Sequence, residues 1–141
     1  MHSCRKLSLF SVEQSRSVRE LVRAFYEELL VPLGPQDQLS LFYGVLSRRD
    51  YVLRYLSLGA SRAFHRPAGG TFSMLPVQGG ALSQGSRHSL GNSTLLQEGS
   101  IQLAASDRLV LLSDGYLELL GGEEEARVTL EKYSQAPAED L

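Results

Sequence analysis

The sequence predicts an α+β domain of mainly antiparallel strands flanked by helices, and three observations lead to this class. A helical pattern of apolar residues occupies residues 17–30, several short strand patterns separated by turn residues fill the middle of the chain, and a second helical pattern follows residue 122. With 141 residues and 43% hydrophobic content, the chain is large enough for one compact domain with a single core.

The first two segments are an arm and a helix. Residues 1–16 show no clear period and are assigned to an N-terminal arm. The helix is predicted from Ser17 to Leu30, because Ser17 can cap it, Glu20 follows three residues later, and prolines and a glycine at residues 32–35 end it. Its apolar stripe consists of Val18, Leu21, Val22, Phe25 and Leu29.

The middle of the chain is typical of an antiparallel meander. The segments 39–46 and 51–58 are rich in strand-forming residues and flank the polar turn 47–50, so they predict a hairpin. The first of these strands is apolar on both faces toward its end, which places it inside a sandwich or under helices. Further strands are expected at Arg62–Arg66 and within residues 71–77.

The second half of the chain begins with a loop. Residues Gly79–Asn92 contain few large apolar side chains, so we predict a mobile surface loop there. Strands follow at Thr94–Ala104 and Arg108–Leu112, joined by a tight turn at Ala105–Asp107. The acidic triplet Glu123–Glu125 then marks the start of a helix, whose N-terminus favours negative charge.

Charge and cysteine content narrow the classes of partner and compartment. Charged residues make up 21% and the net charge is −2, so no electrostatic argument favours nucleic acid or an anionic membrane. Cys4 is the single cysteine, so no intramolecular disulfide can form. No apolar run approaches the roughly 20 residues that cross a bilayer, and the first residues lack a signal-peptide pattern. We therefore expect a soluble, cytoplasmic protein.

Asp114 is the candidate functional residue, since it follows an apolar strand that we expect to be buried and precedes Gly115. Two interpretations remain open from the residues alone. Asp114 can bind a hard cation such as Mg²⁺, because a carboxylate at the end of a buried strand is held rigidly and Gly115 would let the backbone pass close to the ion. Alternatively, Asp114 caps a turn by hydrogen bonding to the next backbone amides, and the local pattern alone favours this role.

Other residue types that could carry chemistry have weaker patterns. The histidines lack the spacing of a shared metal site, and Cys4 has no activating partner nearby. No serine sits in a nucleophile elbow, and the glycine pairs lack the lysine of a phosphate loop. We therefore assign no catalytic residue. The residues concerned are His2, His65 and His88, and the pairs Gly69-Gly70 and Gly79-Gly80.

The motifs F-Y-G-V-L (residues 42–46) and D-R-L-V-L-L-S-D-G-Y-L-E (residues 107–118), with the order of elements, resemble the PPM-type, metal-dependent serine/threonine phosphatases. The likeness is to their bacterial branch, typified by stage II sporulation protein E and the sigma-factor-regulating phosphatases, and it covers residues 17–141. It implies a β-sandwich of mainly antiparallel strands flanked by helices. It also implies that Asp114 is a ligand to one of two Mn²⁺ or Mg²⁺ ions, which activate a water for attack on phosphoserine or phosphothreonine.

The sequence departs from this family pattern at the other metal ligands. Residues 1–38 contain no G-D pair, the late D-D pair is missing, and Asp37 and Asp140 lie in the wrong places to replace them. Residues 59–61 read G-A-S where the family has G-H-P. Hard cations are bound by the number and charge of their ligands. We therefore expect residues 17–141 to form a partial PPM-phosphatase-like domain that is catalytically impaired and does not retain its Mn or Mg centre.

Two classes of function follow from the resemblance. The first is a phosphatase acting on a phosphorylated anti-sigma antagonist or a similar switch protein, with the missing carboxylates supplied by another chain. The second is a non-catalytic protein-interaction module, a pseudo-phosphatase in bacterial signalling. Both imply a phosphoprotein or regulatory protein as partner, and neither implies nucleic acid or membrane. Sheet edges left without outer strands need covering, which favours a homodimer or a partner chain.

Overall fold

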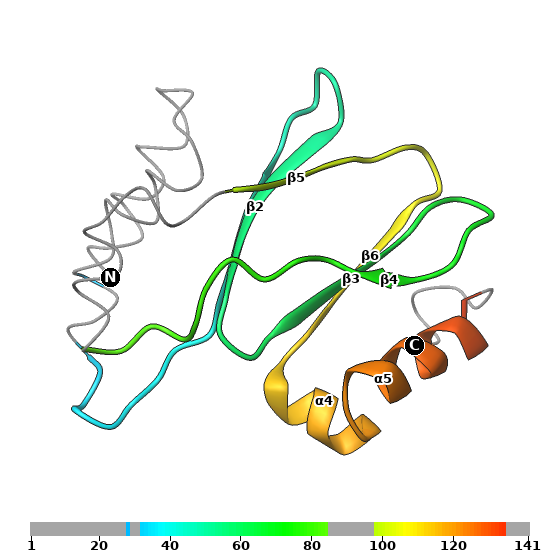
Figure 1. Cartoon of the computed structure of the whole chain (residues 1–141). Helices are drawn as coiled ribbons and strands as arrows, with labels where there is room; N and C mark the ends of the chain where they lie inside the picture. Colours follow the sequence, from blue (N-terminus) through cyan, green and yellow to red (C-terminus); the bar gives the residue numbers. More distant parts are fainter. Residues whose placement is uncertain (1–27, 29–31, 85–97, 135–141) are drawn as a thin grey trace.

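The computed structural model of the chain describes residues 28, 32–84 and 98–134 (Figure 1). These residues form an α+β arrangement, as predicted from the sequence. The N-terminal arm and the helix at Ser17–Leu30 lie outside the described residues, apart from Glu28, which is helical. The strands are β1 (Leu41–Leu46), β2 (Val52–Leu58), β3 (Arg62–Arg66), β4 (Ser73–Met74), β5 (Gly99–Gln102) and β6 (Arg108–Leu112), and the helices are α4 (Asp114–Leu120) and α5 (Glu123–Lys132).

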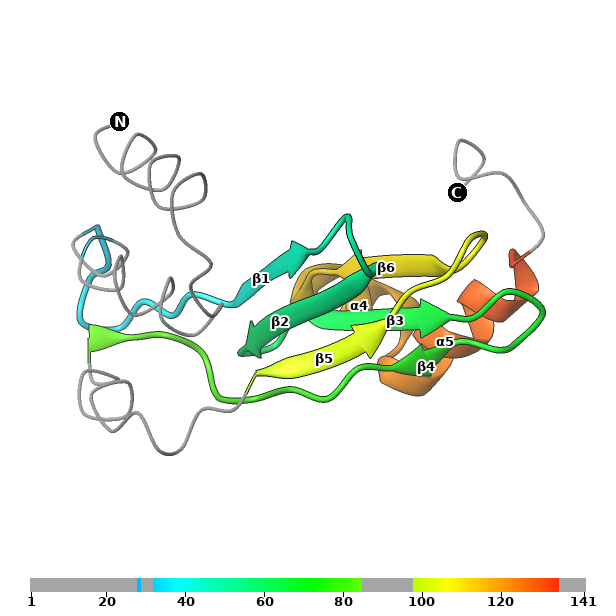
Figure 2. The same cartoon turned by 90° about the horizontal axis from the view of Figure 1, so that it is seen from above.

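The strands form two antiparallel sheets of three strands each, in the orders β1-β2-β5 and β4-β3-β6. The predicted hairpin is confirmed, since β1 pairs with β2 from Leu41 opposite Leu58 to Leu46 opposite Leu53. The predicted strand Arg62–Arg66 coincides with β3. β5 and β6 follow one another in the chain but belong to different sheets (Figure 2). The turn between them therefore carries the chain from one sheet to the other.

Two predicted segments differ from the structure. The strand expected at Thr94–Ala104 is only Gly99–Gln102 in its described part, because the sheet partner β2 pairs with just these four residues. The surface loop expected from Gly79 is wrong for its first residues. Leu82 is only 2% exposed and exchanges two backbone hydrogen bonds of 2.8 Å with Leu39. Backbone pairing thus holds this stretch against the first sheet despite its few large apolar side chains.

A cluster of apolar side chains drawn from both sheets forms one part of the core. Tyr55 of β2 is 1% exposed, and its ring stacks on that of Phe42 with a centroid distance of 5.5 Å. Ala63 of β3 and Leu109 of β6 meet these side chains from the second sheet. The cluster consists of Leu53, Tyr55, Ala63 and Leu75, with Phe42, Ile101, Leu103 and Leu109 packed against it.

The opposite face of the second sheet is covered by the two helices (Figure 1). Phe64 follows Ala63 on β3, so its side chain points to this other face, as alternation along a strand requires. Phe64 is 1% exposed and packs with side chains from both helices. The cluster consists of Phe64, Phe72, Leu117 and Ala126, with Val110, Leu112, Leu120 and Leu130 packed against it. None of the described helices has the length and apolar character needed to cross a membrane.

The turn between β5 and β6 is fixed by Asp107. One carboxylate oxygen accepts a hydrogen bond from the amide of Ala68 at 2.9 Å. The other contacts the amide of Ala104 and Nε2 of His65, both at 3.0 Å. The side chains of His65 and Asp107 are 13% and 7% exposed. The hydrogen bond from His65, followed by those from the two amides, lowers the pKa of Asp107 below its ordinary value.

This lowered pKa predicts a pH-dependent effect of Asp107→Asn. A carboxylate with a lowered folded pKa stabilises the fold above the unfolded value of about 3.9, and this contribution is lost as the pH falls through the folded pKa. We expect the variant to be less stable than wild type at pH 7, and the difference to shrink as the pH falls below about 4. Urea unfolding of both proteins across this range measures the difference. An equal difference at both ends would contradict the assignment.

Candidate functional site

Asp114 is the first residue of α4 and follows the end of β6 by two residues. The chain changes from strand to helix here because Ser113 is the N-cap, with extended backbone and a side-chain oxygen that accepts a hydrogen bond from the Tyr116 amide at 3.3 Å. Asp114 itself accepts a hydrogen bond from the next amide, that of Gly115, at 3.0 Å. Within the described residues the Asp114 carboxylate therefore bonds only to the adjacent amide, and its neighbour Ser113 supplies the helix cap.

The strand that leads to Asp114 is not fully buried, and this part of the prediction was wrong. β6 lies at the edge of its sheet, and Leu111 is 54% exposed, because only one neighbouring strand, β3, covers it. Asp114 is exposed as well. Its second carboxylate oxygen makes no hydrogen bond or ion pair with the described part of the chain. That oxygen is accessible to a ligand from solution.

Among the residues that the structure describes, other carboxylates are not gathered around Asp114. Residues 28, 32–84 and 98–134 contain no group of three or more His, Cys, Asp or Glu side chains that could hold a metal ion. The acidic triplet begins α5, as predicted, and two of its members pair with arginines. Glu123 contacts Nε of Arg62 at 2.5 Å, and Glu124 contacts Arg127 at 2.6 Å. His2, His88 and Cys4 lie outside the described residues.

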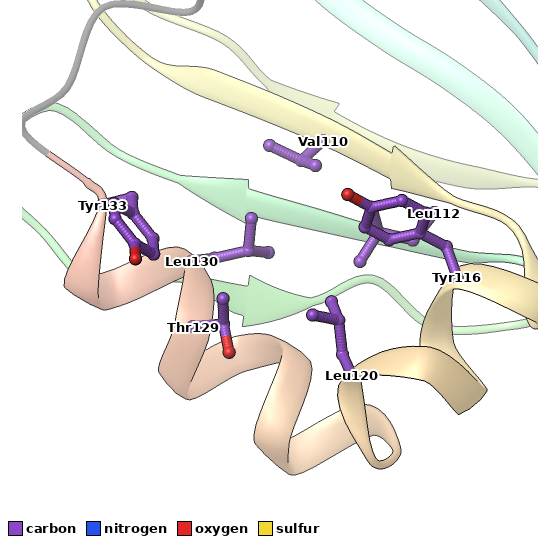
Figure 3. Close-up of a pocket in the computed structure, with 7 residues that line it drawn as sticks. All are labelled: Val110, Leu112, Tyr116, Leu120, Thr129, Leu130 and Tyr133. Atoms are coloured by element: carbon purple, nitrogen blue, oxygen red, sulfur yellow. The ribbon is translucent and has the colours of Figure 1, made fainter. Parts of the chain in front are cut away.

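An apolar groove lies between β6 and the two helices (Figure 3). Its volume is about 500 Å³. Tyr116 and Tyr133 lie at the groove and are 51% and 46% exposed. Helical spacing in the sequence indicates an apolar face that contains Tyr116 and Leu120, and another that contains Leu130 and Tyr133. It does not indicate that both faces lie against an edge strand. The groove is lined by Val110, Leu112, Tyr116, Leu120, Thr129, Leu130 and Tyr133.

Comparison with known proteins gives one structural similarity. No protein-family model matches the sequence, and no curated protein matches it. Among solved structures, the chain is similar to the phosphatase domain of the cell fate determinant SpoIIE from Bacillus subtilis, with a TM-score of 0.49 and 17% sequence identity. The alignment covers 96% of this chain and 57% of that structure's chain. This chain therefore spans little more than half the length of that protein chain.

Proposed function

We propose that this chain is a PPM-type phosphatase-like domain of bacterial signalling that has little or no phosphatase activity by itself. The observation that carries the proposal is the position of Asp114. The motif D-R-L-V-L-L-S-D-G forms an edge strand followed directly by a helix, and the carboxylate at the junction is open to solvent. The proposal includes a β-sandwich flanked by helices and a phosphoprotein or regulatory protein as partner.

In this proposal Asp114 corresponds to one metal ligand of the phosphatase family, but it does not form a complete metal site by itself. Mn²⁺ or Mg²⁺ would activate a water and neutralise phosphoryl oxygens when bound. The free oxygen of Asp114 is suited to one coordination position of such a cation, and the Gly115 amide holds the other oxygen. A two-metal centre needs about six ligands for each ion. The described residues do not fit that centre, so no hydrolytic step is assigned to them.

A non-catalytic interaction module is the second candidate, and the exposed apolar side chains around the groove favour it. Large exposed apolar patches on a protein surface mark sites of interaction. The side chains concerned are Tyr116 of α4 and Tyr133 at the end of α5, which line the groove and are 51% and 46% exposed.

Hydrolysis of a phosphoserine peptide with and without Mn²⁺ tests the proposal. Wild type and Asp114→Asn are expected to show equally low rates, since one carboxylate does not assemble a two-metal centre. Glu118→Gln is the control, because it removes a neighbouring exposed charge on the same helix. Mn²⁺-dependent hydrolysis that persists in Glu118→Gln and disappears in Asp114→Asn would show an active enzyme and contradict the proposal.

A further inference from the structure

Two arginines face each other across β3 and β6. Arg66 lies directly opposite Arg108 in the antiparallel register, so their side chains share one face of the sheet. This face is the one covered by the helices. Phe64 and Val110 form the pair two residues away along the strands, and both pack in the cluster that faces the helices. Side chains two residues apart on a strand lie on the same face. Both arginines are half-buried. Like charges placed opposite each other destabilise a strand pair unless an anion neutralises them.

Arg108 lacks such an anion within the described part of the chain. Its Nη1 is buried and has no hydrogen-bond partner, and none of the described residues forms an ion pair with its guanidinium. Arg66 donates from Nε to the carbonyl oxygen of Gly70 at 3.0 Å. A buried donor without an acceptor is costly, and more so when it is charged. The pair is therefore ready to bind an oxyanion.

The nearby carboxylates are engaged elsewhere. Asp107, next to Arg108 in the chain, accepts hydrogen bonds from His65 and two backbone amides. Glu131 of α5 accepts a hydrogen bond from the Phe72 amide. Another cation lies at this end of α5, since Nζ of Lys132 is 5.5 Å from the centroid of the Tyr133 ring. Neither of these carboxylates forms an ion pair with Arg108 in the described part of the chain.

The arginine pair lies at one end of the apolar groove. Arg108 precedes Val110 by two residues on the same strand face, and β6 then runs from the Tyr133 end of the groove toward Tyr116 (Figure 3). None of the groove-lining residues belongs to β3, so the groove follows the edge strand β6. An extended chain lying along β6 would put every second side chain on this face, about 7 Å apart.

We propose that the groove and the two arginines bind a phosphorylated peptide. The phosphate contacts Arg66 and Arg108, and an apolar side chain two residues away fills the groove. Phosphate is favoured over a carboxylate because its charge of about −1.5 to −2 matches two guanidinium groups, and its three oxygens suit forked donors. This site does not use Asp114, so it is independent of any metal role of that residue.

Fluorescence anisotropy with labelled peptides tests the site. The probe is a phosphoserine peptide with leucine two residues from the phosphoserine, and its unphosphorylated form is the reference. Wild type is expected to bind the phosphorylated form about tenfold more tightly, and Arg108→Gln and Arg66→Gln to lose this discrimination. Arg54→Gln on β2 is the matched control and keeps it. Equal binding of both peptides by wild type, or discrimination retained in Arg108→Gln, would overturn the proposal.

Two further measurements distinguish the contribution of the phosphate to binding from that of the groove, and check that the variant is folded. Inorganic phosphate is expected to compete only weakly, since it cannot fill the groove, and competition as strong as that of the phosphopeptide would overturn the peptide assignment. Arg108→Gln is expected to keep its far-UV circular dichroism and to be no less stable than wild type in chloride, because it removes an unpaired buried charge. A destabilised Arg108→Gln would mean that Arg108 already has a partner in the free protein, which contradicts the site.

Discussion

Phe64→Ala is expected to destabilise the domain by about 3–5 kcal/mol, the usual cost of emptying a buried aromatic site. Phe64 is 1% exposed and sits where β3, Leu117 of α4 and Ala126 of α5 meet. Removing the ring leaves a cavity between the sheet and both helices. A loss of this size approaches the whole stability of a small domain, about 5–15 kcal/mol. Urea unfolding followed by circular dichroism measures it.

Met74→Ala is the matched control for this cavity. Met74 lies directly opposite Phe64 on β4 and is also apolar, but it is 40% exposed. Its truncation is expected to cost less than about 1 kcal/mol, since little buried surface is lost. If both variants lost the same stability, the cluster around Phe64 would not be what holds the helices on the sheet.

Gly99→Ala is expected to destabilise the domain by about 2–3 kcal/mol, through overpacking rather than a cavity. A methyl group at this position on β5 would collide with the ring of Tyr55 on the neighbouring strand β2. Tyr55 cannot move aside easily, because it is 1% exposed and stacks on Phe42. Thermal or urea unfolding of the variant gives the change in the free energy of unfolding.

Gly115→Ala tests whether the effect comes from packing. A methyl group at Gly115, in the first turn of α4, would meet no atom within 4 Å. Because alanine favours a helix over glycine by up to about 1 kcal/mol, this variant should be as stable as wild type or slightly more stable. Equal losses in both glycine variants would contradict the close packing of Tyr55 against Gly99.

Local patterns in the sequence were enough to predict most of the elements. The polar turn at residues 47–50 between two strand-forming runs predicted the hairpin β1–β2, and the acidic triplet predicted the start of α5. These features depend on neighbours within a few positions, which is where propensity and capping act. The motif S-D-G indicated a turn at Asp114, whereas the structure has the helix α4 beginning there, with Ser113 as its cap.

Features that depend on distant pairing could not be predicted in this way. Leu82 looked like part of a polar loop, but it is buried through backbone bonds to Leu39, far away in the sequence. The exposure of Leu111 follows from the edge position of β6, which local periodicity does not reveal. Arg66 and Arg108 likewise lie opposite each other because of the register between β3 and β6, which are more than forty residues apart in the sequence. The metal role of Asp114 stays a prediction from motif resemblance.

The central claim is that Asp114 is not part of a complete two-metal centre. Isothermal titration calorimetry of Mn²⁺ binding to wild type and to Asp114→Asn tests it most directly. If Asp114 is a single surviving ligand, both proteins should bind Mn²⁺ no more tightly than about millimolar, because affinity for hard cations depends on ligand number and charge. Two Mn²⁺ ions bound per chain at micromolar concentration in wild type, and lost in Asp114→Asn, would contradict the account and establish a complete two-metal centre.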